Sequence, residues 1–582
     1  MASAQCSLFS SRHILSSGVA VRVFPNRRGF GGFGCFRVRA RKSVVRSVLE
    51  VDSRTAEGIG AVAVRERGLG LDAAVESELR EKGFMGLRKT KLVCTVGPAC
   101  DSFEELERLA LGGMNVARLN MCHNSMEWHR GVVRKIKRLN EEKGFCVSLM
   151  IDIEGAQMDV VDHGTGSSVK AERNRTALFG CLLPKNTKAL VYLLCKQSPK
   201  GFLKVWKTVH VEEGIIVGDV VVIDGGMTSF EVIDKVGNDL RCKCIDPGLL
   251  LPRAKLSFWR DGKLVDKDLG LPILSRKDWA DIEFGFLKEL ISLQYRSVIR
   301  VLAKIESLES LKNLEEIVEA SDGIMVARGD LGVQIPLEQI PAVQEDITRL
   351  CRQLNKPVIV ASQLLESMVE YPTPTRAEVA DVSEAVRQYA DALMLSGESA
   401  IGLYGDKALS VLRMTSSHME LASRMENQQN LLVLPELGVS LPERIAEQIC
   451  NSSVEIANNL GVDAIFVYTR HGDMASLLSR NRPNSPIFAF TDKNSTRKAL
   501  NLQWGVIPLY VELSDDIDDN IMKTSDLLKA KGMLKGGDVV LVVSDIDSSF
   551  SEPSVFQSIK VDSQQSALAL TTLSDEVAKA AF

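Results

Sequence analysis

Short runs of β-branched and apolar residues recur along most of the chain, separated by longer stretches in which apolar residues return every three or four positions. The longer stretches are typical of amphipathic helices, and their alternation with short apolar runs indicates parallel strands with helices packed outside them. The ranges predicted to be strands of one parallel sheet are 91–96, 115–119, 147–152, 298–306, 323–327, 357–362 and 392–396.

The range 160–255, between the third and fourth of these runs, has a different pattern. It contains many short strand-like runs, glycine and proline turns and little helical periodicity, which indicates an inserted β domain. From residue 433 the alternation resumes, with a predicted helix at 444–460 and predicted strands at 464–468, 486–490 and 539–543. The end of the chain is therefore predicted to form a separate α/β domain.

The composition narrows the class of partner. The 582 residues are 45% hydrophobic and 25% charged, which is ordinary for a globular protein of several domains. The net charge of -4 gives no overall attraction to nucleic acid or to a membrane surface, and no apolar run reaches the roughly 18 residues that span a bilayer. The 12 cysteines contain no CxxC pair, so we expect reduced thiols rather than a metal cluster.

The amino-terminal segment has the composition of a transit peptide. Its first 49 residues contain no Asp or Glu, and serine, glycine and arginine accumulate there. We predict cleavage after residues 38–40, and the lack of a clear amphipathic helix favours a plastid over a mitochondrion. The arginines of this segment are Arg12, Arg22, Arg27, Arg28, Arg37, Arg39 and Arg41.

Polar residues stand at the carboxyl ends of four predicted strands, where a parallel barrel opens its active site. These residues are Arg118, Asn120, Cys122 and His123, then Lys304 and Glu306, then Arg328, Gly329 and Asp330 in the run RGDLG, and finally Ser362. A lysine two positions before a glutamate is either a structural ion pair or part of a site, and Asp330 on the next strand favours a site. Two carboxylates from adjacent strand ends can hold Mg²⁺, and the lysine can neutralise a bound oxyanion.

Several motifs in this order resemble the signatures of the pyruvate kinase family, and the similarity extends from about residue 87 to residue 545. The motifs are KTKLVCTVGP at 89–98, GMNVARLNMCH at 113–123, AKIES at 303–307, SDGIMVARGDLG at 321–332, KPVIVASQLLESM at 356–368, PTPTRAE at 372–378 and MLSGES at 394–399.

This resemblance implies an α/β architecture: a TIM-type (β/α)8 barrel with an inserted small β-barrel lid domain and a C-terminal α/β domain. The expected parts are a transit peptide at 1–40, a linker at 41–87, the barrel domain at 88–159 and 256–425, the lid at 160–255, the C-terminal domain at 426–560 and a tail at 561–582. The implied reaction is phosphoryl transfer from phosphoenolpyruvate to ADP in glycolysis.

The resemblance also implies roles for individual residues. Arg118 would contact the transferring phosphoryl group, and Lys304 would stabilise charge on that group and on the enolate. Gly329 and Ser362 would receive the substrate carboxylate, and Ser362 stands where the family has threonine. Glu306 and Asp330 would hold Mg²⁺, with Asp330 also counted among the substrate-binding residues. Such positioning and charge stabilisation are what phosphoryl transfer needs.

The nucleotide side of the implied site departs from the family, whose third barrel strand ends in LDTKGPEIR. This chain reads IDIEGAQMD at 151–159, so Glu154 replaces a lysine, Asp159 replaces an arginine, Gln157 a glutamate and Ala156 a proline. The two charge reversals change the local charge by about four units, and we expect them to repel nucleotide phosphates.

The potassium site that the resemblance implies is also altered. Asn120 and Asp152 match it, but Cys122 stands for a serine and Ile153 for a threonine. Because a thiol is a poor ligand for a hard cation, the sequence leaves potassium dependence open.

The sequence pattern contains one strand fewer than the eight strands of the family's barrel. The family has a barrel strand after the segment 281–285, whereas this chain continues with a helical pattern at 286–293. Fewer than fifteen residues separate Phe284 from the next predicted strand, and a βαβ unit takes roughly 30. The pattern predicts seven strands, so either the fold rearranges there or the chain lacks an internal segment.

Three hypotheses about function follow. The first is a plastid-type pyruvate kinase that uses phosphoenolpyruvate, ADP and Mg²⁺. The second keeps the enolate chemistry with another acceptor, and the third is a catalytically weak or regulatory subunit that assembles with active kinase chains. The family also implies an oligomer, either a homotetramer or a tetramer with related subunits.

Overall fold

The computed structural model describes the following ranges of the chain: 44–49, 73–153, 159–160, 169–171, 173–174, 176–182, 190–195, 202–206, 215–223, 228–236, 239–250, 256–265, 276–285, 299–426 and 434–544. The chain divides into two compact units. One unit consists of Met1–Ala63, Pro435–Asp492 and Val511–Phe582, and the other of Val64–Leu434 and Lys493–Tyr510. No helix in the described part of the chain is both long and apolar enough to cross a membrane.

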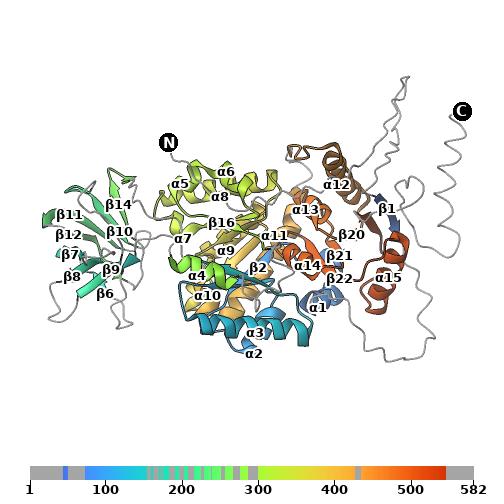
Figure 1. The fold of residues 1–582 in the computed structure, drawn as a ribbon, viewed down its shortest axis with the longest axis horizontal. Helices are drawn as coiled ribbons and strands as arrows, with labels where there is room; N and C mark the ends of the chain where they lie inside the picture. Colours follow the sequence, from blue (N-terminus) through green and yellow to red (C-terminus); the bar gives the residue numbers. More distant parts are fainter. Residues whose placement is uncertain are drawn as a thin grey trace, which may run out of the picture. The chain divides into compact units, whose positions relative to one another are not determined.

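The larger unit is built on a sheet of seven parallel strands in the order β16-β17-β18-β19-β2-β3-β4 (Figure 1). All seven predicted strands are confirmed. They are β2 (Lys91–Thr95), β3 (Val116–Asn120), β4 (Ser148–Asp152), β16 (Leu302–Ile305), β17 (Gly323–Ala327), β18 (Val358–Ala361) and β19 (Ala392–Leu395).

Amphipathic helices cover the outward side of this sheet, as the apolar spacing predicts. Leu106, Ile136 and Leu409 are fully buried in one cluster with the outward strand residues Leu92 and Cys94. The helices contributing to this layer and to the neighbouring cluster over β16–β18 are α2 (Phe103–Leu111), α3 (Met126–Lys143), α6 (Leu314–Ala320), α8 (Ile340–Gln353), α9 (Arg376–Arg387) and α11 (Gly405–Glu426).

Polar caps fix where several of these helices begin. The side chain of Ser102 accepts a hydrogen bond from the amide of Glu105 at the start of α2, and Ser125 accepts one from Trp128 at the start of α3. Thr375 and Glu378 form a reciprocal capping box at the start of α9. These bonds satisfy amides that have no partner inside the helix, so each strand-to-helix turn is set locally.

The described residues contain seven strands of the barrel rather than eight. Helix α4 (Arg276–Gly285) precedes residues 286–301, and β16 begins at Leu302. That interval is shorter than the roughly 30 residues of a complete βαβ unit. Strands β4 and β16 are therefore the two edges of the described sheet.

Antiparallel strands make up most of the described residues between 159 and 264, a stretch that includes the predicted inserted β domain at 160–255 and is drawn in green in Figure 1. One sheet has the order β15-β14-β10-β11-β12-β7-β8-β9-β5, and β13 pairs with β6. The bounds are β5 (Asp159–Val160), β6 (Val169–Ala171), β7 (Thr176–Leu182), β8 (Leu190–Cys195), β9 (Phe202–Trp206), β10 (Val220–Ile223), β11 (Thr228–Val236), β12 (Asp239–Asp246), β13 (Gly248–Leu250), β14 (Leu256–Arg260) and β15 (Lys263–Leu264).

The smaller unit is the predicted C-terminal α/β fold. Strands β23 (Val540–Ser544), β20 (Ala464–Tyr468) and β21 (Ile487–Thr491) lie side by side in parallel, with every residue buried. The helices of this unit are α12 (Leu441–Leu460), α13 (Asp473–Arg480) and α15 (Ile517–Ala530). The three predicted strands and the predicted helix of this region are confirmed.

The stretch 41–87, expected to be a linker, contains two regular elements. Strand β1 (Val44–Leu49) pairs antiparallel with β23, and helix α1 (Ala73–Lys82) precedes the barrel. Leu79 of α1 is 3% exposed, so this helix buries apolar surface. Part of the stretch predicted as a linker is therefore regular structure, because β1 pairs with β23 and α1 buries Leu79.

Residues 493–510, which fall in the range predicted as C-terminal domain, belong to the barrel unit. They comprise α14 (Asn494–Leu500) and β22 (Val506–Tyr510). The side-chain amide of Asn501 donates to the carbonyl oxygens of Asn115 at 2.7 Å and Cys146 at 2.5 Å. The amide of Trp504 donates to Asp391 Oδ1 at 3.3 Å. These partners precede β3, β4 and β19, so the segment covers the amino ends of the strands.

Candidate active site

The inner side of the parallel sheet changes from apolar to polar toward the carboxyl ends of its strands. Side chains two positions apart on a strand share a face. Val93, Val116 and Met325 lie in the inner apolar cluster, with Met150 and Leu302 packed against it. Two positions after four of these residues come Thr95, Arg118, Asp152 and Lys304. The sheet therefore presents these four polar side chains on its inner face.

Arg118 is held in one orientation by two neighbouring strand ends. Its Nε and Nη2 lie 2.8 and 2.7 Å from Oδ2 of Asp152 on β4. Its Nη1 donates to Oγ1 of Thr95 on β2 at 2.9 Å, and that hydroxyl donates to the carbonyl of Leu395 at 2.8 Å. With 12% of its side chain exposed, Arg118 keeps a fixed cation at the sheet mouth.

Lys304 lies between two carboxylates. Its Nζ is 2.8 Å from Oε2 of Glu306 and 3.7 Å from Oδ1 of Asp152. Burial by itself would lower the pKa of Lys304, and Arg118 acts in the same direction. The charges of Asp152 and Glu306 outweigh both, so the pKa of Lys304 is raised above its ordinary value. Lys304 is therefore cationic at neutral pH.

Glu306 and Asp330 come from adjacent strands. Glu306 follows the last residue of β16, and Asp330 lies in the single turn α7 (Arg328–Leu331) directly after β17. In the described ranges no group of three or more His, Cys, Asp or Glu side chains is placed to hold a metal ion. Two carboxylates from neighbouring strand ends fit Mg²⁺, which usually takes one or two carboxylates and completes its shell with water and substrate oxygens.

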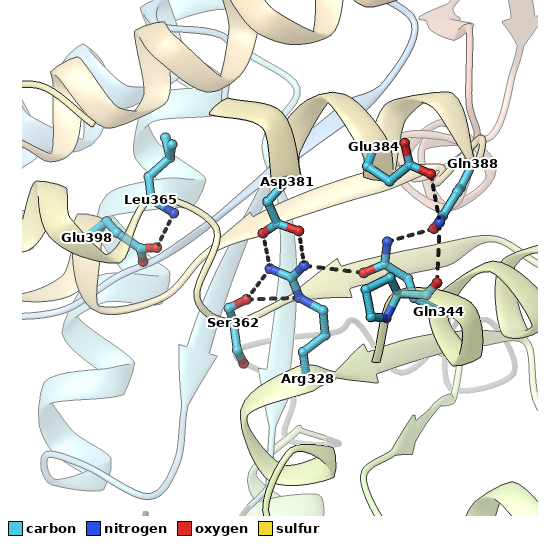
Figure 2. A network of polar contacts seen from close by, with 9 residues as sticks. Arg328, Gln344, Ser362, Leu365, Asp381, Glu384, Gln388 and Glu398 are labelled. Atoms are coloured by element: carbon cyan, nitrogen blue, oxygen red, sulfur yellow. Dashed lines mark hydrogen bonds and ion pairs between the residues drawn. The ribbon is translucent and has the colours of Figure 1, made fainter. Parts of the chain in front are cut away.

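Gly329 and Ser362 lie next to each other, as the predicted carboxylate site requires. A Cβ atom on Gly329 would lie 3.5 Å from Cβ and 3.6 Å from Oγ of Ser362. The backbone of Ser362 has a φ of 72°, in the left-handed region that few non-glycine residues adopt. Its carbonyl oxygen accepts two hydrogen bonds from Arg328, which also pairs with Asp381 (Figure 2).

The residues named for potassium do not form an evident cation site. Asn120 Oδ1 accepts a hydrogen bond from the amide of Cys122 at 3.1 Å, and both oxygens of Asp152 face Arg118 or Lys304. Two side-chain cations therefore share the carboxylate of Asp152, and the potassium role of Asn120 and Asp152 stays a prediction from the sequence.

The altered nucleotide side lies largely outside the described residues. Glu154, Ala156 and Gln157 fall within 154–158, which the structure does not describe. Asp159 is described only as part of the backbone of β5, where it pairs with Trp206 of β9. The expected repulsion of nucleotide phosphates therefore stays a prediction from the sequence.

Sequence reasoning missed the residues that hold the predicted ones in place. Thr95 supports Arg118, and Asp381 supports Ser362 through Arg328, which the sequence placed at a strand end without a role. Thr95 could have been found as a polar residue two positions after Val93 at a strand end. Asp381 gave no such signal, because it lies on helix α9, 53 residues from its partner.

A parallel α/β-barrel sheet with two fixed cations, Arg118 and Lys304, and the carboxylates of Asp152 and Glu306 at one mouth is typical of an enzyme that acts on small anionic substrates. The family model for the pyruvate kinase barrel domain matches residues 87–301 and 288–409, and that for the pyruvate kinase alpha/beta domain matches 447–552. The chain belongs to the pyruvate kinase family. These matches confirm the expected barrel and C-terminal fold classes.

Individual relatives agree with this assignment. The chain is 55% identical over 503 residues to pyruvate kinase isozyme A, chloroplastic, of Ricinus communis, which covers 82% of this chain and 84% of that protein. It is 49% identical over 580 residues to the Nicotiana tabacum protein of the same name, covering 90% and 94%. A pyruvate kinase of Staphylococcus haemolyticus is 32% identical over 483 residues, covering 79% and 78%.

Proposed function

We propose that this plastid pyruvate kinase uses the cluster of Arg118, Asp152, Lys304 and Glu306 to transfer a phosphoryl group from phosphoenolpyruvate to ADP. The observation that carries the proposal is the pair of fixed cations, since Arg118 and Lys304 share the carboxylate of Asp152 at the sheet mouth. Phosphoryl transfer relies on positioning and charge stabilisation, which such cations supply.

In this mechanism the bond between phosphorus and the enol oxygen of phosphoenolpyruvate breaks. A bond forms between phosphorus and a terminal oxygen of ADP, and the enolate that remains takes a proton to become pyruvate. Arg118 orients the phosphoryl group because Asp152 and Thr95 fix its guanidinium. Lys304 stabilises the charge that develops on the phosphoryl and enolate oxygens.

The remaining residues bind and orient the substrate. The backbone at Gly329 and the hydroxyl of Ser362 receive the carboxylate of phosphoenolpyruvate, supported by their adjacency. Glu306 and Asp330 would hold Mg²⁺, which when bound neutralises charge on the substrate oxygens. The pyruvate kinase family generally depends on Mg²⁺ and K⁺, and we propose that Mg²⁺ is the metal retained here.

The enzyme works in the plastid, as the chloroplastic names of its relatives and its leader without acidic residues support. We propose that Glu154 and Asp159 weaken the binding of ADP phosphates relative to relatives with basic residues there. We also propose an oligomer, either of identical chains or with related kinase subunits, on the strength of the family alone.

The test is steady-state pyruvate formation by the mature chain with phosphoenolpyruvate, ADP and Mg²⁺, after its folding is confirmed by circular dichroism. Lys304→Met should lower kcat by about 10² to 10³-fold, because it removes one charge-stabilising group. Lys356→Met is the matched control, since Lys356 donates to the carbonyl of Ser321 at the opposite end of the sheet. It should leave kcat unchanged.

The alternatives give different outcomes. A folded wild-type chain that binds phosphoenolpyruvate with Mg²⁺ but forms no pyruvate from ADP would overturn the proposal in favour of another acceptor or a regulatory subunit. Restoration of activity on mixing with a related kinase chain would select the subunit. Equal kcat in wild type and Lys304→Met would show that the lysine has no role in the chemistry.

A further inference from the structure

We propose that Arg328 and Asp381 form a positioning pair for substrate recognition: they hold the main chain of Ser362 so that its hydroxyl faces Gly329. The inference rests on the proposed function, because it concerns the carboxylate-binding end of the same site. It assigns a role to two residues that do not themselves contact the substrate.

Arg328 contacts Ser362 and Asp381 at once, and its Nη1 also donates to Oε1 of Gln344 at 3.3 Å (Figure 2). Its Nε and Nη2 donate to the carbonyl oxygen of Ser362 at 3.2 and 2.7 Å. Its Nη1 and Nη2 donate to Oδ1 and Oδ2 of Asp381 at 2.6 and 2.8 Å. Arg328 is 7% exposed, and a two-pronged pairing of a planar guanidinium with a carboxylate permits little rotation.

The main chain at Ser362 needs such a support. Ser362 and Gln363 have φ values of 72° and 55°, so two successive non-glycine residues adopt the left-handed conformation. Such residues persist only where their surroundings impose the conformation. The carbonyl of Ser362 belongs to the peptide that joins these two residues, and Arg328 fixes the direction in which that carbonyl points.

Arg328 also connects the two halves of the carboxylate site. Gly329 follows it directly in the chain, whereas Ser362 follows the neighbouring strand β18. Because the side chain of Arg328 binds Ser362 while its main chain continues into Gly329, one residue sets the spacing between the two. That spacing decides whether a carboxylate can contact both.

The rest of the segment after β18 is held by other groups. The amide of Leu365 donates to Oε1 of Glu398 at 3.2 Å, and the amide and hydroxyl of Ser367 donate to Glu378 at 2.7 and 2.6 Å. A change at Arg328 therefore leaves two anchors in place. We expect a local shift at Ser362 rather than a general loss of the fold.

The experiment compares Arg328→Gln and Asp381→Asn with the wild type in the assay of pyruvate formation. Arg328→Gln should raise the KM for phosphoenolpyruvate by about tenfold or more and leave the KM for ADP within about twofold, since small displacements of a positioning group weaken binding selectively. Asp381→Asn should raise the KM for phosphoenolpyruvate by about threefold, because Arg328 can still donate to the carbonyl oxygen of Ser362.

Glu378→Gln is the matched control. Glu378 anchors the same segment at Ser367, five residues beyond Ser362. It should leave the KM for phosphoenolpyruvate within about twofold of wild type, although it removes one acceptor oxygen and the charge from the helix cap and so lowers thermal stability. An equal rise in KM in this control would overturn the proposal, because any disturbance of the segment would then suffice.

A double-mutant cycle tests whether Arg328 acts through Ser362. In a Ser362→Ala background, Arg328→Gln should raise the KM for phosphoenolpyruvate by less than about twofold, because the hydroxyl that it positions is already absent. If Arg328→Gln raised the KM for phosphoenolpyruvate by the same factor in the Ser362→Ala background as in the wild type, the proposal would be overturned. Arg328→Lys should recover part of the loss, since one ammonium can reach one of the two partners but lacks the planar fork.

Direct binding separates this proposal from the proposed function. If the wild type binds phosphoenolpyruvate with Mg²⁺ but does not turn over, weaker binding in both Arg328→Gln and Asp381→Asn still supports the positioning pair. If Arg328→Gln does not fold, the affinity of Asp381→Asn for phosphoenolpyruvate is the deciding measurement. A folded Asp381→Asn variant with wild-type affinity for phosphoenolpyruvate would overturn the proposal.

Discussion

Lys304 Nζ lies 3.7 Å from Oδ1 of Asp152, although these residues end the two edge strands of the seven-stranded sheet. One further strand between the edges would separate them by about 9.6 Å, twice the usual strand spacing. The side chains of Lys304 and Asp152 together are long enough to bridge that distance. The described sheet is therefore curved enough to bring its edges together at the mouth, where the site residues meet.

The shared carboxylate of Asp152 predicts how the pH profile responds to its loss. Because the pKa of Lys304 is raised above its ordinary value of 10.5, the lysine stays charged through the neutral and moderately alkaline range. Its ion pairs stabilise the fold below pH 10.5, and that stability is lost as pH rises through the raised pKa. Asp152→Asn removes one of the charges that raise the pKa, so the alkaline fall in kcat should move to lower pH.

The measurement is kcat against pH for wild type and Asp152→Asn at saturating substrates. An alkaline limb at the same pH in both proteins would contradict the role given to Asp152. Asp322→Asn is a suitable control, because Asp322 directly precedes β17, at the amino end of the strands, and forms an exposed ion pair with Arg300. It should leave the limb in place.

Gly329→Ala should separate binding from folding. The new Cβ would meet Ser362 at ordinary contact distances of 3.5 and 3.6 Å, so the fold should tolerate it. It occupies the space proposed for the substrate carboxylate, and the KM for phosphoenolpyruvate should rise by about tenfold.

Gly97→Ala is the contrasting variant for this measurement. Its Cβ would lie 2.4 Å from the carbonyl oxygen of Ala400, which is backbone and cannot move aside easily. This variant should lower the free energy of unfolding by about 1 to 3 kcal/mol. An unchanged KM in Gly329→Ala would show that the carboxylate binds elsewhere.

Asn501→Ala should weaken the fold without changing substrate affinity. Asn501 is 4% exposed, and its amide donates to the carbonyls of Asn115 and Cys146. Its removal leaves two buried acceptors without this donor, at a cost of about 1 to 3 kcal/mol. Urea unfolding measures the loss, and Asn313→Ala, at a surface helix cap, should change stability by less than about 0.5 kcal/mol.

Restoring basic residues at the nucleotide side should strengthen ADP binding. Glu154→Lys with Asp159→Arg reverses the two charges that distinguish this chain from its family, so the KM for ADP should fall several-fold while that for phosphoenolpyruvate stays constant. Glu141→Lys introduces a positive charge on the exposed face of helix α3 as a control. A KM for ADP that does not respond would show that these positions do not face the phosphates.

Local patterns determined the elements from the sequence. The seven apolar runs became β2, β3, β4 and β16 to β19, because a parallel strand that is covered on both faces of the sheet favours apolar residues. The same alternation along each strand placed Arg118, Asp152 and Lys304 on the inner face near the carboxyl ends. The sequence also indicated that one strand of the barrel is missing from the pattern.

Only the tertiary structure decided which polar residues become partners. Asp152 joins Arg118 to Lys304, and Arg328 reaches Asp381 on a helix 53 residues away. Residues 493–510 pack under the barrel strands, although the sequence groups them with the C-terminal domain. The period of a strand or helix is a local property of consecutive residues, whereas these pairings depend on strand order, register and curvature, which arise only when distant segments pack together.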